Sequence, residues 1–136
     1  AYYWPYWLSE SAVTETRPAS AINGEDTSHA GLTLQIVRAL AEDHEVFAQE
    51  DMRRFAQTVL NGFGRRTDGV LFGKITGTPD AAPSLAGNPA KWIFLAQVNA
   101  QVRGRITAFY LNYAPTPGPL DLAELLYFGV TEPAKP

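Results

Sequence analysis

The sequence predicts a mainly helical fold made of antiparallel helix pairs, with one short β-hairpin between them. In five segments the apolar residues recur every three or four positions, which is the spacing of an amphipathic helix. Short stretches rich in Gly, Pro and Asn separate these segments, and short connections favour antiparallel neighbours. With 136 residues, the chain has the length of one ordinary domain and can bury a core.

The first helix is expected at about residues 27–43. Its apolar side chains recur every four residues and are expected to face the core: Leu32, Ile36 and Leu40, with Val37 beside them. Three residues at its start have side chains that can cap a helix: Asp26, Thr27 and Ser28. We therefore expect the chain to enter this helix through a polar stretch.

The second helix is expected at about residues 50–61. Acidic residues in its first turn suit the positive end of the helix dipole, and Gly62 and Gly64 are typical of a helix end. Beyond it, Asp68 and Gly69 form a turn signal before a segment with the period of a strand. Residues 65–78 are therefore predicted to form the β-hairpin arm.

Three further helices are expected at about residues 89–98, 100–113 and 120–128. Asn88 followed by Pro89 is a favourable start, because proline suits the first position of a helix. Trp92 is expected in the core. A single bent helix in place of the first two of these three is the alternative.

The composition excludes several classes of function. The net charge is −3, and no Lys/Arg run is longer than a pair, so the chain lacks the basic surface of a nucleic-acid-binding protein. No apolar run approaches the roughly 18 residues that a membrane span needs. The chain has no cysteine, which rules out disulfides and thiolate metal sites. We expect neither a cofactor nor a nucleic-acid or membrane partner.

The densest polar cluster is Glu25, Asp26 and His29, at the start of the first helix. Both carboxylates lie three or four residues before the imidazole, so each can reach it once this turn is helical. A carboxylate beside histidine fixes the ring tautomer and increases its basicity, which suits acid–base catalysis or binding of a hydroxyl-rich ligand. The alternative is structural: Asp26 or Ser28 caps the helix, and His29 bonds a loop carbonyl.

The same three side chains would offer a metal two oxygen ligands and one nitrogen ligand. A closed structural zinc site normally has four ligands at recognised spacing, and the cluster falls short of that. We therefore expect no metal site.

The second candidate site is the aromatic segment at the start of the chain. It contains five aromatic residues that could stack on sugar rings: Tyr2, Tyr3, Trp4, Tyr6 and Trp7. Filling a core or a subunit contact is the alternative role for these rings. The segment is expected to be extended or irregular, because Pro5 disfavours helical geometry at Trp4.

Together these features resemble six-hairpin (α/α) toroid proteins. The resemblance lies in an aromatic extended segment, a loop, and Gly-Glu-Asp-x-Ser-His-Ala at residues 24–30, which opens an amphipathic helix. Residues 51–56 and 92–95 are similar to the alternating outer and inner helices of these proteins. The layout extends over about residues 1–128, whereas residues 24–30 alone resemble a motif.

Six-hairpin toroids occur in glycoside hydrolases, polysaccharide lyases and uronate epimerases. The resemblance implies the C-terminal part of such a toroid, from a secreted or periplasmic bacterial protein, with a polysaccharide or oligosaccharide in a cleft at the start of the first helix. Five helices are too few for a complete ring, and a partial ring would expose apolar faces. The implied partner is therefore the remainder of the toroid chain, another subunit or another copy; the alternative is a small helical domain that shares only the local pattern.

Two functions follow as hypotheses. In the first, the chain is part of a carbohydrate-active enzyme with Glu25, Asp26 and His29 as catalytic residues, for hydrolysis, elimination or epimerisation. In the second, it is a non-catalytic helical module that binds a glycan or a protein through its N-terminal Tyr/Trp segment.

Overall fold

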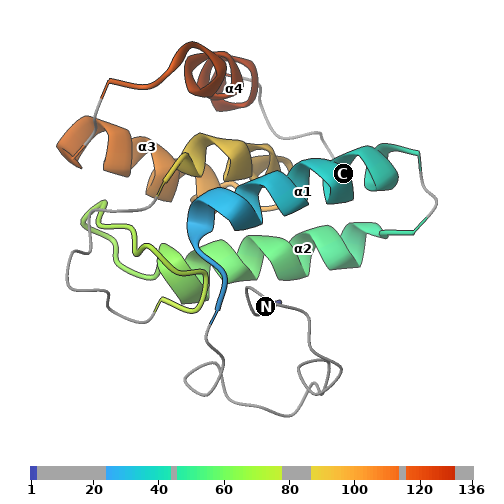
Figure 1. Cartoon of the computed structure of the whole chain (residues 1–136). Coiled ribbons are helices and arrows are strands. Elements are labelled where there is room, and N and C mark those ends of the chain that lie inside the picture. The colour runs from blue at the N-terminus through green and yellow to red at the C-terminus, as the bar shows by residue number, and fades with distance from the viewer. Residues whose placement is uncertain (3–23, 44–45, 78–86, 114–115, 131–136) are drawn as a thin grey trace.

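The computed structural model describes residues 1–2, 24–43, 46–77, 87–113 and 116–130, and these residues are mainly helical (Figure 1). The elements follow in the order α1 (Thr27–Glu42), α2 (Gln49–Gln57), the π-helical η3 (Thr58–Phe63), the 3-10 helix η4 (Pro89–Gln97), α3 (Gln101–Tyr113) and α4 (Pro119–Val130). Since η3 continues α2, all five predicted helical segments are confirmed. The alternative of one bent helix is wrong, because η4 and α3 are separate elements.

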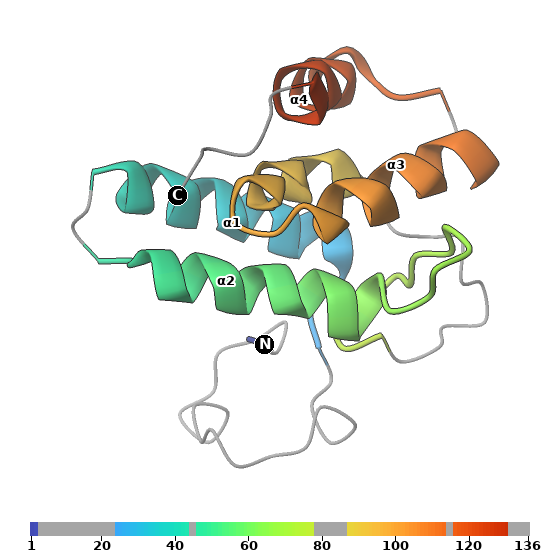
Figure 2. The same cartoon turned by 180° about the vertical axis from the view of Figure 1, so that it is seen from behind.

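The centre of the fold is η4, which contacts α1, α2, α3 and α4. Its sequence is apolar on nearly every side, as expected of a helix surrounded by others. Trp92 and Ile93 are fully buried, which confirms the predicted place of Trp92 in the core. The two views show α1 and α2 side by side and antiparallel, with α4 on the far side of η4 from α2 (Figures 1 and 2).

Helix α1 buries a face that agrees only in part with the predicted one, because Val37 of the predicted stripe is buried. Ala30 and Leu34 are fully buried, whereas Leu32 and Ile36 are 53% and 65% exposed. The prediction that Leu32 and Ile36 face the core is therefore wrong. The reason is the small residue Gly31, where an added Cβ would lie only 3.2 Å from Lys91 Cβ, so η4 packs closely against this side of α1.

The second helical segment extends slightly further than predicted. It ends in the π turn of η3, where Gly62 leaves helical geometry with φ −99° and ψ −114°. The backbone N–H of Gly64 then donates to the carbonyl of Val59 at 2.7 Å. The helix therefore ends at the two predicted glycines, but its last turn is widened and reaches Phe63.

The predicted β-hairpin is not confirmed. Within residues 65–77 there is no paired strand, and the bridge in this region joins Lys74 to Asp26. The N–H of Phe72 donates to the carbonyl of Phe63 at 2.8 Å. This segment consists of bends and turns with one isolated bridge, and it bonds to η3 and to the start of α1 instead of folding back on itself.

Helix α4 is apolar on several sides. Phe128 is buried against the core, while four other large apolar residues of this helix are exposed: Leu120, Leu122, Leu126 and Tyr127. No helix within the described ranges is both long enough and apolar enough to cross a membrane.

Candidate functional site

The start of α1 is organised by Asp26, which is the N-cap of this helix. Its Oδ1 accepts hydrogen bonds from the backbone N–H groups of Ser28 and His29, each at 3.0 Å. The first N–H groups of a helix have no partner inside the helix, and this carboxylate oxygen satisfies two of them. Of the three predicted caps, Asp26 is the one that the structure uses.

The second oxygen of Asp26 holds the imidazole of His29. The Oδ2 atom lies 2.7 Å from Nδ1 of His29. Because a carboxylate can only accept, the ring carries a proton on Nδ1 in this contact, whether the ring is neutral or charged. The His29 and Asp26 side chains are 55% and 38% exposed, so a solute can reach both.

The environment of Asp26 keeps it ionised. Partial burial raises the pKa of Asp26, but hydrogen bonds from the backbone and ring of His29, its charge, and the N–H of Ser28 together lower the pKa below its ordinary value. At neutral pH, Asp26 is therefore an acceptor and a counter-charge, not a proton donor.

The backbone before α1 is fixed by a distant part of the chain. The N–H of Thr27 donates to the carbonyl of Gly73 at 2.8 Å, and the N–H of Ile75 donates to the carbonyl of Glu25 at 3.0 Å. Residues 65–77 thus hold the predicted site in place, although they form no hairpin.

A second support comes from η4 and the residues before it. The indole Nε1–H of Trp92 donates to the carbonyl of Thr27 at 3.1 Å. At Gly87 an added Cβ would lie 2.9 Å from Cβ of Ser28, so the chain passes close to the first turn of α1. The Asp26–His29 pair is consequently exposed on one side and backed by ordered structure on the other.

Tyr2, predicted to bind substrate, packs against the surface of α2. Its hydroxyl donates to Oδ1 of Asp51 at 2.7 Å and accepts from Nη1 of Arg54 at 3.1 Å. Its ring packs on Phe55 with the centroids 4.9 Å apart. The hydrogen bond from Tyr2 is the main cause that lowers the pKa of Asp51. These contacts make Tyr2 an anchor between the first residues and α2.

The other predicted sugar-binding rings, Tyr3, Trp4, Tyr6 and Trp7, lie outside the described residues. The structure therefore brings Asp26 and His29 into contact, with Glu25 next to them in the chain, and places Tyr2 against a different helix. Within the described part of the chain, no group of three or more His, Asp or Glu side chains could hold a metal ion.

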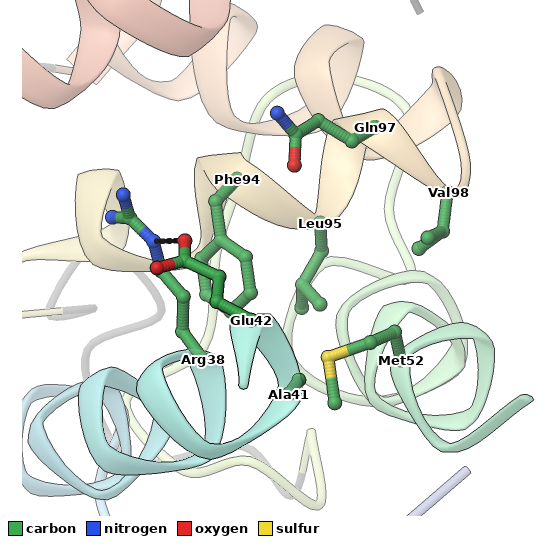
Figure 3. Close-up of a pocket in the computed structure, with 8 residues that line it drawn as sticks. All are labelled: Arg38, Ala41, Glu42, Met52, Phe94, Leu95, Gln97 and Val98. Atoms are coloured by element: carbon green, nitrogen blue, oxygen red, sulfur yellow. Dashed lines mark hydrogen bonds and ion pairs between the residues drawn. The ribbon is translucent and has the colours of Figure 1, made fainter. Parts of the chain in front are cut away.

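Sequence reasoning missed two hollows that border Arg38. The smaller has a volume of about 130 Å³, enough for one small apolar group. Figure 3 shows the side chains of Met52, Phe94 and Leu95 around it, with the ion pair of Arg38 and Glu42 at its edge. Its walls come from α1, α2 and η4, so no single segment of the sequence could reveal it.

The larger hollow is a groove of about 640 Å³ between α1, η4 and α4. Its apolar lining includes Leu32, Leu120 and Tyr127, and its charged lining includes Lys91 and Asp121. The signal that could have indicated it is the apolar composition of residues 119–130, which leaves α4 without a clear polar face. Neither this groove nor the smaller hollow is lined by the Asp26–His29 pair.

Arg38 joins α4 to the body of the protein. Its Cζ atom lies 4.6 Å from the ring centroid of Phe128 and 5.7 Å from that of Phe94. Its Nη1 atom lies 3.6 Å from Oε2 of Glu124, and its Nε donates to Glu42 at 2.9 Å. One side chain of α1 thus contacts both η4 and α4.

Comparison of the sequence with protein-family models and with curated proteins, and of the fold with solved structures, returned no match.

Proposed function

We propose that the chain is part of a carbohydrate-active enzyme whose acid–base site lies at the start of α1. The observation that carries the proposal is the 2.7 Å contact between Oδ2 of Asp26 and Nδ1 of His29. A histidine that is oriented by an ionised carboxylate and reachable by a solute is a typical general acid or base. The resemblance of residues 24–30 to (α/α) toroid proteins supplies the class of substrate, a polysaccharide or oligosaccharide.

The two residues have different roles in this proposal. His29 exchanges a proton with the substrate, and Asp26 is a positioning residue that fixes the ring and its tautomer. Glu25 adds a second carboxylate beside the pair. Because several hydrogen bonds lower the pKa of Asp26, this residue is a poor general acid.

This difference favours elimination or epimerisation over hydrolysis. Hydrolysis of a glycosidic bond usually needs two carboxyl groups, one of which is protonated. Elimination and epimerisation need a base that removes a proton from carbon, which an imidazole can provide. The reaction proposed for the assembled protein is therefore proton abstraction from a sugar ring.

The proposed chemistry needs a cleft around the Asp26–His29 pair. Asp26 and His29 are exposed, and they line neither of the two hollows beside Arg38. In the proposed enzyme, the remaining helices of a toroid, on the remainder of the chain or on another copy, complete the cleft.

The test is turnover of neutral and acidic polysaccharides by the protein together with any polypeptide that purifies with it. Unsaturated products report elimination, solvent deuterium in the sugar reports epimerisation, and new reducing ends report hydrolysis. His29→Ala is expected to reduce turnover by about 10²-fold or more, as is typical when a general acid or base is removed. Asp26→Asn is expected to reduce it too, because an amide can cap the helix but cannot impose the same tautomer.

The matched control is Leu111→Ala on α3, which removes an exposed side chain far along the sequence from the pair and is expected to leave turnover unchanged. Circular dichroism of each variant establishes that the fold is intact. Retained turnover in both His29→Ala and Glu25→Gln would exclude the proposed roles.

A second candidate function is that of a non-catalytic helical module that binds a protein or a glycan. The observation in its favour is the set of exposed apolar side chains on α1 and α4, which is typical of a binding surface. This candidate predicts saturable binding without turnover of any polysaccharide. Loss of that binding in Trp4→Ala or Trp7→Ala would place the interaction on the N-terminal segment.

A further inference from the structure

Lys74 stands opposite Asp26 at the point where the chain enters α1. The two residues form an antiparallel bridge, and one backbone hydrogen bond on each side of the pair closes it, at 2.8 and 3.0 Å. Gly24 and Thr76 continue the same register, since an added Cβ on Gly24 would lie 2.6 Å from Cγ2 of Thr76. Figure 1 shows the segment before α1 beside the segment that contains Lys74. Two residues bridged in this way have their side chains on the same side of the backbone and close together.

The side chain of Lys74 reaches solvent next to the Asp26–His29 pair. Its neighbours Gly73 and Ile75 are buried, whereas Lys74 itself is partly exposed. The side chains of Asp26 and His29 are 38% and 55% exposed. Because lysine carries its charge at the end of a flexible four-carbon stem, the ammonium can extend past Asp26 into the solvent beside the imidazole.

The carboxylate of Asp26 is held by other partners. Its Oδ1 accepts from the backbone N–H groups of Ser28 and His29, and its Oδ2 lies 2.7 Å from Nδ1 of His29. The contacts with these two residues are what lower the pKa of Asp26. An ammonium group has three N–H donors, so Lys74 can bind an anion while it also contacts an acceptor of the protein.

A cation at this place suits the proton abstraction proposed for His29. Because Nδ1 of the ring carries a proton toward Asp26, the basic atom of the neutral imidazole is Nε2. A proton leaves carbon readily only if the electron pair that remains can move onto a neighbouring group. The carboxylate of a uronate is such a group, and a fixed cation beside it stabilises the negative charge that develops on its oxygens.

We infer that Lys74 binds the carboxylate of a uronate residue, so that the substrate class of the site is an acidic polysaccharide. The inference rests on the proposed function, in which His29 is the base. The C–H bond next to the carboxylate breaks, and its proton moves to Nε2 of His29. The electron pair moves toward the carboxylate carbon, and Lys74 donates a hydrogen bond to the oxygen that takes up the charge.

The same intermediate leads to either proposed reaction. In elimination, the electron pair forms a double bond to the next ring carbon as the C–O bond to the leaving sugar breaks. The leaving oxygen takes the proton from the imidazolium of His29. In epimerisation, the carbon takes a proton from water on its other face, and His29 returns its proton to water.

The first test is binding, measured by titration calorimetry on the His29→Ala protein with any polypeptide that purifies with it. The probes are oligosaccharides of galacturonate, glucuronate and mannuronate, each compared with its neutral methyl ester. One of the acids is expected to bind about 10-fold more tightly than its ester, as for a hydrogen bond to a charged group. A second substitution, Lys74→Met, keeps a long side chain and is expected to abolish this preference, whereas Lys74→Arg retains it.

The second test is turnover of the same acid and of its ester, with His29 in place. Lys74→Met is expected to lower kcat/KM for the acid by about 10²-fold, as when a donor to a developing negative charge is removed. The loss for the ester is expected to be smaller, whereas a merely structural role of Lys74 would reduce both equally. The matched control is Arg53→Met, which removes the same charge from an exposed side chain on α2 and is expected to change neither value.

The inference is overturned if the His29→Ala protein binds none of the acids more tightly than its ester, or if the preference persists in Lys74→Met. It is also overturned if Lys74→Met lowers turnover of acid and ester by the same factor. Failure of the proposed function looks different. In that case no polymer is turned over, or turnover survives His29→Ala, while the preference for the acid still depends on Lys74.

Discussion

The indole N–H of Trp92 donates a hydrogen bond to the carbonyl oxygen of Thr27, with a distance of 3.1 Å between the two heavy atoms. Both residues are fully buried. The bond joins the central helix η4 to the residue that follows the N-cap of α1. The geometry of the candidate site is thus tied directly to the centre of the core.

Trp92→Phe is expected to lower the free energy of unfolding by about 2–3 kcal/mol. The change removes the hydrogen bond to Thr27 and leaves part of the indole volume empty, next to the ring of Phe63 at a centroid distance of 4.8 Å. Urea unfolding followed by circular dichroism measures the loss. Tyr113→Phe removes an exposed hydroxyl and serves as the control, and an equal effect of the two changes would refute the role of this bond.

Signals within short segments of the sequence were sufficient to predict most of the helices. The helices could be predicted because their periods and end signals lie within each segment. The contact of Asp26 and His29 could be predicted for the same reason, since residues three apart on a helix are neighbours.

Features that depend on distant partners could not be predicted. The face of α1 that is buried depends on the close approach of η4 at Gly31, because α1 has apolar residues on two sides. The strand period within residues 65–77 does not identify the partners of this segment, which are η3 and the start of α1. Tyr2 meets Asp51 across 49 positions of the chain, so its structural role was invisible in the sequence.

Two substitutions separate the contributions that the helix cap and the charge of Asp26 make to the free energy of unfolding. Asp26→Ala removes the cap and is expected to lower the free energy of unfolding by about 1 kcal/mol at neutral pH. Asp26→Asn keeps a capping oxygen but removes the charge that pairs with His29, so its effect is expected to be smaller. Urea unfolding at neutral pH measures both, and a larger loss in Asp26→Asn would contradict this assignment.

The stability difference between the wild type and Asp26→Asn is expected to depend on pH. Hydrogen bonds lower the pKa of Asp26 in the folded state, so the ionised carboxylate stabilises the fold above the unfolded pKa of about 4. This contribution is lost as the pH falls through the lower, folded pKa. Unfolding curves measured from neutral to strongly acid pH check the sign, and a difference that grows on acidification would be contrary to expectation.

Gly69 and Gly104 form a matched pair for testing the backbone. Gly69 has a φ of +85°, and an added Cβ would lie 2.7 Å from the carbonyl oxygen of Ala108. Gly69→Ala is therefore expected to lower the free energy of unfolding by about 1–3 kcal/mol. Gly104 lies inside α3, and an added Cβ there would meet no other part of the protein within 4 Å. Gly104→Ala is therefore expected to raise the free energy of unfolding by about 0.5–1 kcal/mol. Thermal unfolding of both variants measures the two opposite signs, and a destabilised Gly104→Ala would contradict the helix assignment.

Arg38→Lys keeps the positive charge but is expected to weaken the packing of α4 against the rest of the protein. The planar guanidinium lies 4.6 Å from the ring centroid of Phe128 and bonds Glu42, and an ammonium group cannot reproduce both the stacking and the geometry of these bonds. Amide hydrogen exchange in residues 119–130 is therefore expected to accelerate on the order of 10-fold, which corresponds to a loss of about 1.4 kcal/mol. The control is Arg53→Lys on α2, where the arginine is exposed and pairs with Glu50 at 3.5 Å. Exchange confined to α4 in Arg38→Lys would support the role of Arg38 as the link between α1 and α4, whereas unchanged exchange there would mean that the packing of Phe128 alone holds the helix.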